Sequence, residues 1–250
     1  MTRIVLAGCC GNMGRNVVSA AAERKDFEIV AGIDRVADNA LGFPVFENYD
    51  AITSKADVVV DFSNPALLSE TLAYVTRTGT PLVLATTGLS DEQIADVKRT
   101  AETVPVFYTA NLSIGVNLLR ELAKTAAKIL GSGFDVEIVE AHHNRKLDAP
   151  SGTAIMLADA VKEARPGAYN VYDRHARREK RGADEIGISS IRGGTIVGEH
   201  DVIFAGKDEV IRLTHTAQSR AVFAEGALNA AAFLVGKAPG LYDMGDIIRS

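Results

Sequence analysis

The stretch RIVLAGCCGNMG at residues 3–14 decides the fold. It opens with a short apolar strand and leads into a helical pattern over Met13–Glu23. Between them, three glycines recur at three-residue spacing: Gly8, Gly11 and Gly14. A second strand-like run, Phe27–Ile33, ends at Asp34. A strand, a glycine-rich turn, a helix and a second strand that ends in an acid are together typical of a dinucleotide-binding unit.

Each glycine has an expected use in such a turn. We expect Gly8 to allow the tight turn, Gly11 to let the backbone approach a pyrophosphate, and Gly14 to let the helix pack on the strand. The N-terminus of the helix offers N–H donors and partial positive charge to the phosphates. The spacing is G-x-x-G-x-x-G, so Cys10 stands where the usual G-x-G-x-x-G pattern has its second glycine.

The acid after the second strand bears on the choice of nucleotide. Asp34 is suited to accept hydrogen bonds from the adenosine ribose, and Arg35 beside it is suited to a 2′-phosphate. The pair therefore predicts tolerance of both NADH and NADPH. The alternative is an ordinary βα turn that carries a surface Asp-Arg pair.

Strands and helices alternate through the rest of the first half. The expected strands are Val58–Asp61, Leu82–Ala85 and Val104–Tyr108, with helices over residues 65–77 and after Ser90, which forms a capping box with Gln93. This alternation predicts an α/β fold, a Rossmann-like doubly wound parallel sheet whose strand ends and ligands share one edge. Thr86, Thr87 and Gly88 lie at that edge, where a nicotinamide is expected.

The pattern changes after Asn111. A helix over Ile114–Leu130 precedes four strand-like segments separated by tight turns: Asp135–Ala141, Ile186–Ile191, Asp201–Ala205 and Glu209–His215. These predict a second, α+β domain with a mixed or antiparallel sheet. An alanine-rich helix over Phe223–Val235 is expected to pack back on the first domain. We therefore predict a dinucleotide-binding domain of residues 1–111 and 221–250 and a substrate-binding domain of residues 112–220.

Composition excludes several classes of protein. The chain has 250 residues, 47% of them hydrophobic, and a net charge of −5. A disordered chain is excluded, and neither nucleic acid nor membrane is an expected partner. The basic stretch Arg174–Arg181 is interpreted as a solvated loop. The only cysteines, Cys9 and Cys10, are adjacent and cannot staple a domain, which favours a cytoplasmic protein.

The densest chemistry lies in EAHHNRKLDAPSGTA at residues 140–154. Ser151 is a good N-cap for a helix to about Glu163, so Gly152 and Thr153 are expected to present N–H groups to a carboxylate or phosphate. Lys146 adds a cation, and His142 or His143 is suited to act as acid or base. A zinc site and a structural loop with surface histidines are the alternatives; an anion-binding catalytic loop is favoured because donors and cations converge.

This segment resembles the signature of the 4-hydroxy-tetrahydrodipicolinate reductase family, also called dihydrodipicolinate reductase. The resemblance extends along essentially the whole chain, through ATTG at 85–88, ANLSIG at 110–115, IVGEHD at 196–201, THTAQSR at 214–220 and GLYDM at 240–244. It implies NADH- or NADPH-dependent reduction of a small cyclic dicarboxylate, 4-hydroxy-tetrahydrodipicolinate, to tetrahydrodipicolinate in lysine and diaminopimelate biosynthesis. Water is lost from the substrate along the way.

The resemblance also implies roles for residues. His142 becomes the proton donor or acceptor and Lys146 its partner, while His143, Gly152 and Thr153 hold the substrate carboxylates. The cofactor would be held by Gly8, Cys9, Cys10, Gly11, Asn12, Met13, Asp34, Arg35, Ala85, Thr86, Thr87, Thr109, Ala110, Asn111 and Leu112. No metal is expected. A homotetramer assembled through the sheet of the second domain is implied.

Three other functions compete with this interpretation. The first is another nicotinamide-dependent dehydrogenase of amino-acid metabolism, although the chain lacks the second-domain cysteine that an aspartate-semialdehyde dehydrogenase needs. The second is a non-catalytic NAD(P)H sensor that uses Cys9 and Cys10 as its redox element. The third is a metal-dependent hydrolase, whose activity a chelator would abolish.

Overall fold

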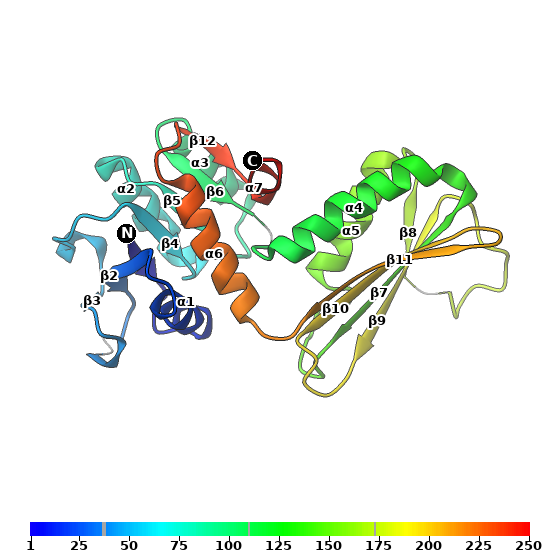
Figure 1. The fold of residues 1–250 in the computed structure, drawn as a ribbon, viewed down its shortest axis with the longest axis horizontal. Coiled ribbons are helices and arrows are strands. Elements are labelled where there is room, and N and C mark those ends of the chain that lie inside the picture. Colours follow the sequence, from blue (N-terminus) through cyan, green and yellow to red (C-terminus); the bar gives the residue numbers. More distant parts are fainter. Residues whose placement is uncertain (37–38, 110, 173) are drawn as a thin grey trace. The chain divides into compact units, whose positions relative to one another are not determined.

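The computed structural model describes residues 1–36, 39–109, 111–172 and 174–250. The chain divides into two compact units, each drawn in Figure 1: unit 1 comprises Met1–Ser113 and Arg220–Ser250, and unit 2 comprises Ile114–Ser219. No helix in the described ranges is long and apolar enough to cross a membrane.

Unit 1 is built on a seven-stranded sheet in the order β12-β6-β5-β4-β1-β2-β3, in which every pair of neighbours is parallel. The strands are β1 (Thr2–Ala7), β2 (Phe27–Ile33), β3 (Val45–Phe46), β4 (Val58–Asp61), β5 (Leu82–Leu84), β6 (Pro105–Tyr108) and β12 (Gly240–Tyr242). Strands β1 to β6 follow the order 3-2-1-4-5-6 of doubly wound dinucleotide-binding sheets. The predicted fold class is therefore confirmed. The two short edge strands β3 and β12 were not among the predicted strands, although β3 completes the doubly wound order.

Helices cover both faces of this sheet. They are α1 (Asn12–Ala22), α2 (Leu68–Thr78), α3 (Asp91–Thr100), α6 (Ala221–Leu234) and α7 (Met244–Arg249), with single-turn helices η1 (Asn39–Leu41), η2 (Tyr49–Ala51) and η3 (Pro65–Leu67). Unit 1 has two hydrophobic cores, one on each face of the sheet, because successive side chains of a strand point to opposite faces. Ile4 and Leu6 of β1 pack with α1 and α6, whereas Val5 and Ala7 pack with α2 and α3. The predicted capping box of Ser90 and Gln93 is present at the start of α3.

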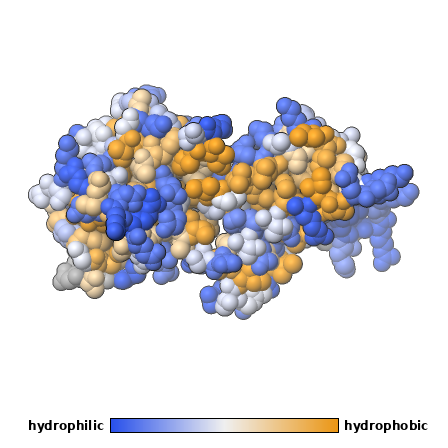
Figure 2. Space-filling view, viewed as in Figure 1, coloured by the Kyte–Doolittle hydropathy of each residue, from blue (hydrophilic) through white to orange (hydrophobic). Residues whose placement is uncertain are grey.

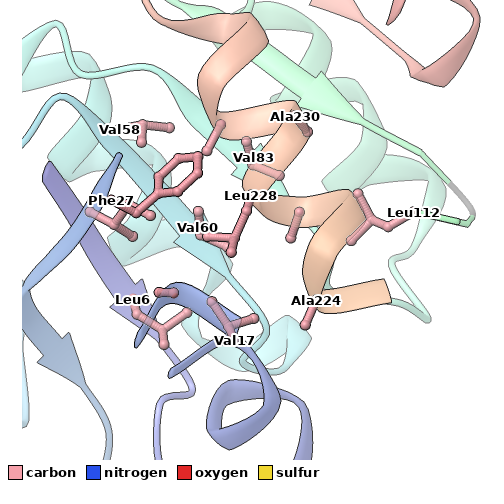
Figure 3. Packing of buried hydrophobic residues seen from close by; sticks show 14 of the residues in the cluster. Leu6, Val17, Phe27, Val58, Val60, Val83, Leu112, Ala224, Leu228 and Ala230 are labelled. Atoms are coloured by element: carbon pink, nitrogen blue, oxygen red, sulfur yellow. The ribbon is translucent and has the colours of Figure 1, made fainter. Parts of the chain in front are cut away.

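Helix α6 returns from the far end of the sequence to the core of unit 1, as its pattern predicts (Figure 3). Leu228 lies among Val60 and Val83 of the sheet, and small residues allow a close approach. A Cβ on Gly226 would lie 1.8 Å from the carbonyl oxygen of Leu112, so only glycine permits this contact. The start of α6 is thereby held close to the chain that follows β6.

Unit 2 contains a five-stranded sheet in the order β11-β10-β7-β9-β8. Its elements are α4 (Ile114–Leu130), η4 (Gly131–Gly133), β7 (Asp135–His142), α5 (Gly152–Ala164), β8 (Tyr169–Val171), β9 (Glu185–Arg192), β10 (Gly198–Ala205) and β11 (Val210–Ala217). β10 runs antiparallel to β7 and β11, whereas β9 runs parallel to β7 and β8, so the sheet is mixed. Within this unit, α4 and α5 lie on one face of the sheet (Figure 1).

The surface of unit 2 is unevenly apolar. Ile114, Leu118 and Leu122 recur every four residues along α4 and are each between one third and one half exposed. Figure 2 shows hydrophobic residues gathered over the helical side of this unit. The last residue of the basic stretch, Arg181, is held to unit 2 by its contacts. It pairs with Asp135 and Glu137 at 2.9 and 3.0 Å and donates to three backbone carbonyls.

Candidate active site

The glycine turn has the geometry that its sequence predicts. Gly8 has a φ of +74°, and a Cβ there would lie 2.6 Å from the carbonyl oxygen of Phe62. A Cβ on Gly14 would lie 2.1 Å from the carbonyl oxygen of Gly8, so α1 packs directly on the turn. Gly11 is the N-cap residue of α1 and has no side chain to cover the first turn. The N–H groups of that turn therefore suit an anionic pyrophosphate.

Asp34 is fastened to the same turn. One carboxylate oxygen accepts a hydrogen bond from the N–H of Cys10 at 2.9 Å, and the other accepts one from the N–H of Arg35 at 2.8 Å. Each oxygen retains a second lone pair for a ligand. Asp34 and Arg35 line a cavity of about 690 Å³ together with Gly8, Cys10 and Gly11. This arrangement fits the adenosine half of a dinucleotide, with its ribose hydroxyls at Asp34.

A second cavity of unit 1, of about 350 Å³, lies beside the first and shares Phe62 and Ser63 with it. Seven predicted cofactor residues line it: Met13, Ala85, Thr86, Thr87, Thr109, Asn111 and Leu112. Phe62, Ser63 and Phe223 also line it and were not predicted. The cavity follows the carboxyl ends of neighbouring parallel strands, which is where this class of sheet binds its ligands.

The remaining predicted cofactor residues are placed differently. Asn12 is the exposed first residue of α1. The side chain of Cys9 is fully buried and packs against Gly32, where a Cβ would lie 2.5 Å from its sulfur. Ala110 lies outside the described residues.

Behind the second cavity lies a buried carboxylate, Asp61, at the end of β4. It accepts hydrogen bonds from the Thr86 hydroxyl at 3.1 Å and from the N–H of Ser63 at 2.8 Å. Its other oxygen accepts one from the Thr71 hydroxyl at 2.9 Å. Asp61 thus positions Ser63 and Thr86, which both line the cavity. No role for Asp61 was predicted from the sequence.

The second group of functional side chains lies within unit 2, at the carboxyl end of β7. Glu140 and His142 are two residues apart on the strand, so their side chains point to the same face of the sheet. This is the face that α5 covers. The Arg192 guanidinium binds both oxygens of Glu140, each at 2.7 Å. The N–H of Ser151 donates to the same carboxylate at 3.1 Å. Glu140 is completely buried, so these contacts replace its hydration.

The electrostatics of this carboxylate follow from its partners. Burial alone would raise the pKa of Glu140, but hydrogen bonds from Arg192, Ser190 and His142 outweigh it and lower the pKa to about 2. Glu140 is therefore ionised at neutral pH. Its second oxygen lies 2.6 Å from Nδ1 of His142. The carboxylate fixes the ring and places the proton of the neutral imidazole on Nδ1, which leaves Nε2 for chemistry.

The other ring nitrogen of His142, Nε2, faces Gly198 of the neighbouring strand β10, which has no side chain. A Cβ on Gly198 would lie 3.1 Å from Nε2, so glycine keeps this atom uncrowded. The His200 ring lies edge-on to that of His142, with centroids 5.1 Å apart. Nε2 of His200 forms a hydrogen bond with the Ser151 hydroxyl at 2.9 Å. Burial, followed by the proximity of His142, lowers the pKa of His200 to about 4, so His200 is neutral.

The loop after β7 brings the other predicted residues to the start of α5. The Lys146 ammonium pairs with Asp148 at 2.9 Å, and the backbone N–H of Lys146 donates to the carbonyl of His143 at 3.1 Å. Ser151 caps α5 by accepting from the N–H of Ala154 at 3.1 Å, as predicted. Gly152 and Thr153 therefore occupy the first turn, where N–H groups suit a carboxylate. Any anion at Lys146 competes with Asp148.

Arg192, Ser190 and His200 escaped sequence reasoning. Arg192 and Ser190 of β9 lie opposite His142 and Glu140 in the register of the sheet. His200 of β10 lies opposite Glu140 on its other side. These residues lie far along the chain, and only the register of the sheet brings them together. The usable signal was Glu140 itself, an acid two residues before a histidine, at a position that continues the inward-facing residues Val136 and Ile138.

Comparison with known proteins agrees with this geometry. The family described as "Dihydrodipicolinate reductase, N-terminus" matches residues 2–112, and "Dihydrodipicolinate reductase, C-terminus" matches residues 115–248. A 4-hydroxy-tetrahydrodipicolinate reductase of Caldanaerobacter subterraneus is 49% identical over 100% of this chain and 99% of its own length. One of Staphylococcus epidermidis is 46% identical over 92% and 94%, respectively.

Solved structures give the same result. A dipicolinate-bound dihydrodipicolinate reductase from Paenisporosarcina sp. has a TM-score of 0.81, with 28% identity over 97% of both chains. A WlbA dehydrogenase of Bordetella pertussis, solved with NADH and UDP-GlcNAcA, has a TM-score of 0.60 at 17% identity over 95% of this chain and 90% of its own, and supports the fold alone. The chain thus belongs to the dihydrodipicolinate reductase family, nicotinamide-dependent oxidoreductases of lysine and diaminopimelate biosynthesis.

Proposed function

We propose that this chain reduces 4-hydroxy-tetrahydrodipicolinate to tetrahydrodipicolinate with NADH or NADPH, and that His142 and Lys146 carry out the proton chemistry. The observation that carries the proposal is the Glu140–His142 pair, held at 2.6 Å beside the first turn of α5. A histidine oriented by a buried carboxylate, next to an anion-binding helix start, suits acid–base work on a carboxylate substrate.

Unit 1 holds the cofactor in this proposal. The pyrophosphate lies at the first turn of α1, the adenosine ribose at Asp34, and the nicotinamide in the smaller cavity beside Thr86 and Thr87. Arg35, next to Asp34, accommodates the additional phosphate of NADPH. When bound, the cofactor supplies the hydride for the reduction.

Residues 112–220 form the substrate-binding and oligomerisation domain of this proposal, and residues 1–111 with 221–250 form the cofactor-binding domain. The substrate carries two carboxylates. His143 and the N–H groups of Gly152 and Thr153 bind and orient them at the start of α5. The dipicolinate in the relative from Paenisporosarcina is a planar cyclic dicarboxylate of the same kind, which supports this assignment.

Lys146 and His142 then act on the reacting atoms. Lys146 leaves Asp148 for the incoming carboxylate, because the Asp148 side chain is more than half exposed and regains water. His142 delivers a proton through Nε2 as negative charge develops on the substrate ring, and Glu140 stabilises the imidazolium before transfer. Loss of water from the 4-hydroxy group belongs to the same overall reaction.

We further propose a homotetramer assembled through the sheet of unit 2, in the cytoplasm. Both helices of the unit lie on one face of the sheet, and the opposite face carries Ile191 and Val210, each more than half exposed. A sheet face that exposes such side chains is suited to pair with a second copy. Sedimentation equilibrium tests the assembly, and a monomer at micromolar concentration would refute it.

The reaction is tested by following the oxidation of NADH and of NADPH with substrate made freshly from pyruvate and aspartate semialdehyde. Pyridine-2,6-dicarboxylate, a planar analogue, should compete with the substrate. Turnover that the analogue blocks is the expected result, and the two cofactor rates report the selection by Asp34 and Arg35. Tight cofactor binding without turnover would refute the substrate assignment.

A further inference from the structure

Cys9, Cys10 and Asp34 form a cluster that the proposed reaction does not use. Their ligand atoms, two sulfurs and a carboxylate oxygen, all lie within 4.8 Å of one another. The two sulfurs are 3.9 Å apart. Asp34 follows the cysteines by 24 residues in the sequence, so the cluster exists only because β1 and β2 are adjacent.

The spacing suits a shared metal ion better than a disulfide. Two sulfurs bound to one tetrahedral Zn²⁺ ion, with Zn–S distances of about 2.3 Å, lie about 3.8 Å apart. A disulfide requires about 2.05 Å between the sulfurs and more than about 4.4 Å between the Cα atoms. The Cα atoms of neighbours such as Cys9 and Cys10 are held about 3.8 Å apart by the peptide bond. A bridge between the two sulfurs would therefore distort the glycine turn, whereas their present separation of 3.9 Å already matches that of an ion-bound pair.

We propose that Cys9, Cys10 and Asp34 form a binding site for a thiophilic divalent cation such as Zn²⁺, and that the bound ion and the nucleotide exclude each other. Two thiolates and a carboxylate provide three of the four ligands of a tetrahedral ion, and water completes the set. Cys10 and Asp34 line the cavity of about 690 Å³, which gives the ion a route to the site.

Proton and charge balance follow from the ligands. Cysteine binds a metal ion as the thiolate, so both thiols lose their protons when the ion binds. Each ion bound releases two thiol protons to the solvent. The three ligands carry three negative charges, and the ion carries two positive charges. Arg15, whose Nε donates to the carbonyl oxygen of Cys10 at 3.1 Å, supplies the remaining positive charge.

The exclusion of the nucleotide rests on the proposed function, whereas the ion site does not. Asp34 is the carboxylate assigned to the ribose, and Cys10 lies in the turn assigned to the pyrophosphate. An ion between them takes the lone pairs that the ribose needs and fills the same cavity. The metal-bound chain is therefore expected to bind NADH weakly, and saturating NADH to expel the metal.

The site is tested by titrating the reduced, metal-free full-length protein with Cd²⁺, a spectroscopic substitute for Zn²⁺. We expect an ultraviolet thiolate-to-cadmium charge-transfer band that saturates at one ion per chain, with release of two protons. Cys10→Ser should abolish the band. Asp34→Asn should weaken binding by at least about 10-fold, because even the loss of an outer-shell partner costs that much. Asp50→Asn, at a carboxylate 80% exposed and outside the cluster, is the matched control and should bind like the wild type.

The outcomes separate the two parts of the proposal. A missing band, a band that survives Cys10→Ser, or equal affinity in Asp34→Asn and the wild type would overturn the ion site; unchanged far-ultraviolet circular dichroism shows that a variant is folded. Simultaneous binding of Cd²⁺ and NADH would overturn the exclusion alone. If the metal-free protein fails to bind NADH, the proposed function fails, and the Cd²⁺ titration still decides the ion site.

Discussion

Replacing Glu140 by glutamine removes a charge while keeping the shape of the side chain. In the wild type, one oxygen accepts from Ser151 and Arg192, and the other accepts from Arg192 and lies against Nδ1 of His142. A glutamine has one accepting oxygen and one donating amide. Whichever way it turns, its amide faces a donor, so it cannot satisfy Arg192 and His142 together.

The magnitude follows from the pKa of Glu140, which is about 2 against an ordinary value of 4.5. At about 1.4 kcal/mol per pH unit, the ionised carboxylate stabilises the folded state by about 3 kcal/mol. Because the pKa is lowered on folding, this stabilisation is complete above pH 4.5 and is lost as the pH falls through about 2. We expect Glu140→Gln to lower the free energy of unfolding by about 3 kcal/mol at neutral pH, and to flatten its pH dependence over that window.

The catalytic effect is expected in kcat. Misplacement of His142 by about 1 Å costs on the order of 100-fold in rate. The affinity for NADH should not change, because the predicted cofactor residues belong to unit 1. The measurements are steady-state kinetics, NADH titration by fluorescence, and urea unfolding.

A matched control exists on the same strand. Glu137 lies on the opposite face of β7 and pairs with Arg181 at 3.0 Å, with its side chain one third exposed. Glu137→Gln should cost less than about 1 kcal/mol and leave kcat near that of the wild type, since partly exposed ion pairs contribute little. Equal kcat in Glu140→Gln and Glu137→Gln would refute the positioning role of Glu140. Equal stability would refute the electrostatic argument.

Three further predictions concern other parts of the molecule. Lys146→Ala should lower kcat by about 100-fold with unchanged affinity for NADH, and wild-type turnover would refute its role. Gly14→Ala forces a Cβ to within 2.1 Å of the Gly8 carbonyl, so we expect about 1–3 kcal/mol less stability and weaker NADH binding in a fluorescence titration. The pKa of His200 is about 4 against 6.5 unfolded, so stability should fall by about 3 kcal/mol as the pH drops between these values. His200→Gln should remove that dependence, and an unchanged pH profile of unfolding would contradict the assignment.

Most of unit 1 was predictable because its signals are local. The glycine turn, the capping box at Ser90 and the buried run of β4 are each written in a few consecutive residues. β3 and β12 were not predictable, since two- and three-residue strands exist only through pairing with β2 and β6. In unit 2 four of the five strands were predictable and the three-residue β8 was not. The insertion of β7 between β9 and β10 depends on contacts distant in sequence.

The candidate site divides in the same way. The residues that face ligands are contiguous, as in the loop from His142 to Thr153, because a turn and a helix start are local structures. Their supports are not: Arg192 reaches Glu140 across 52 residues, and Thr86 reaches Asp61 across 25. Such pairs depend on sheet register, which a single sequence does not state.

In both units, however, the supporting residue is a buried acid near the carboxyl end of a strand: Asp61 follows Val58–Val60, and Glu140 continues the buried alternate positions Val136 and Ile138 of β7. Burying an unpaired carboxylate costs several kcal/mol, so an acid in such a run implies donors close to it. In unit 1 those donors belong to the ligand site, because ligands bind at this edge of a parallel sheet. In unit 2 one of the donors, Ser151, is the N-cap residue of α5. An acid at an inward-facing position near the end of a strand is therefore a signal that one sequence does contain, and it points to both positioning carboxylates.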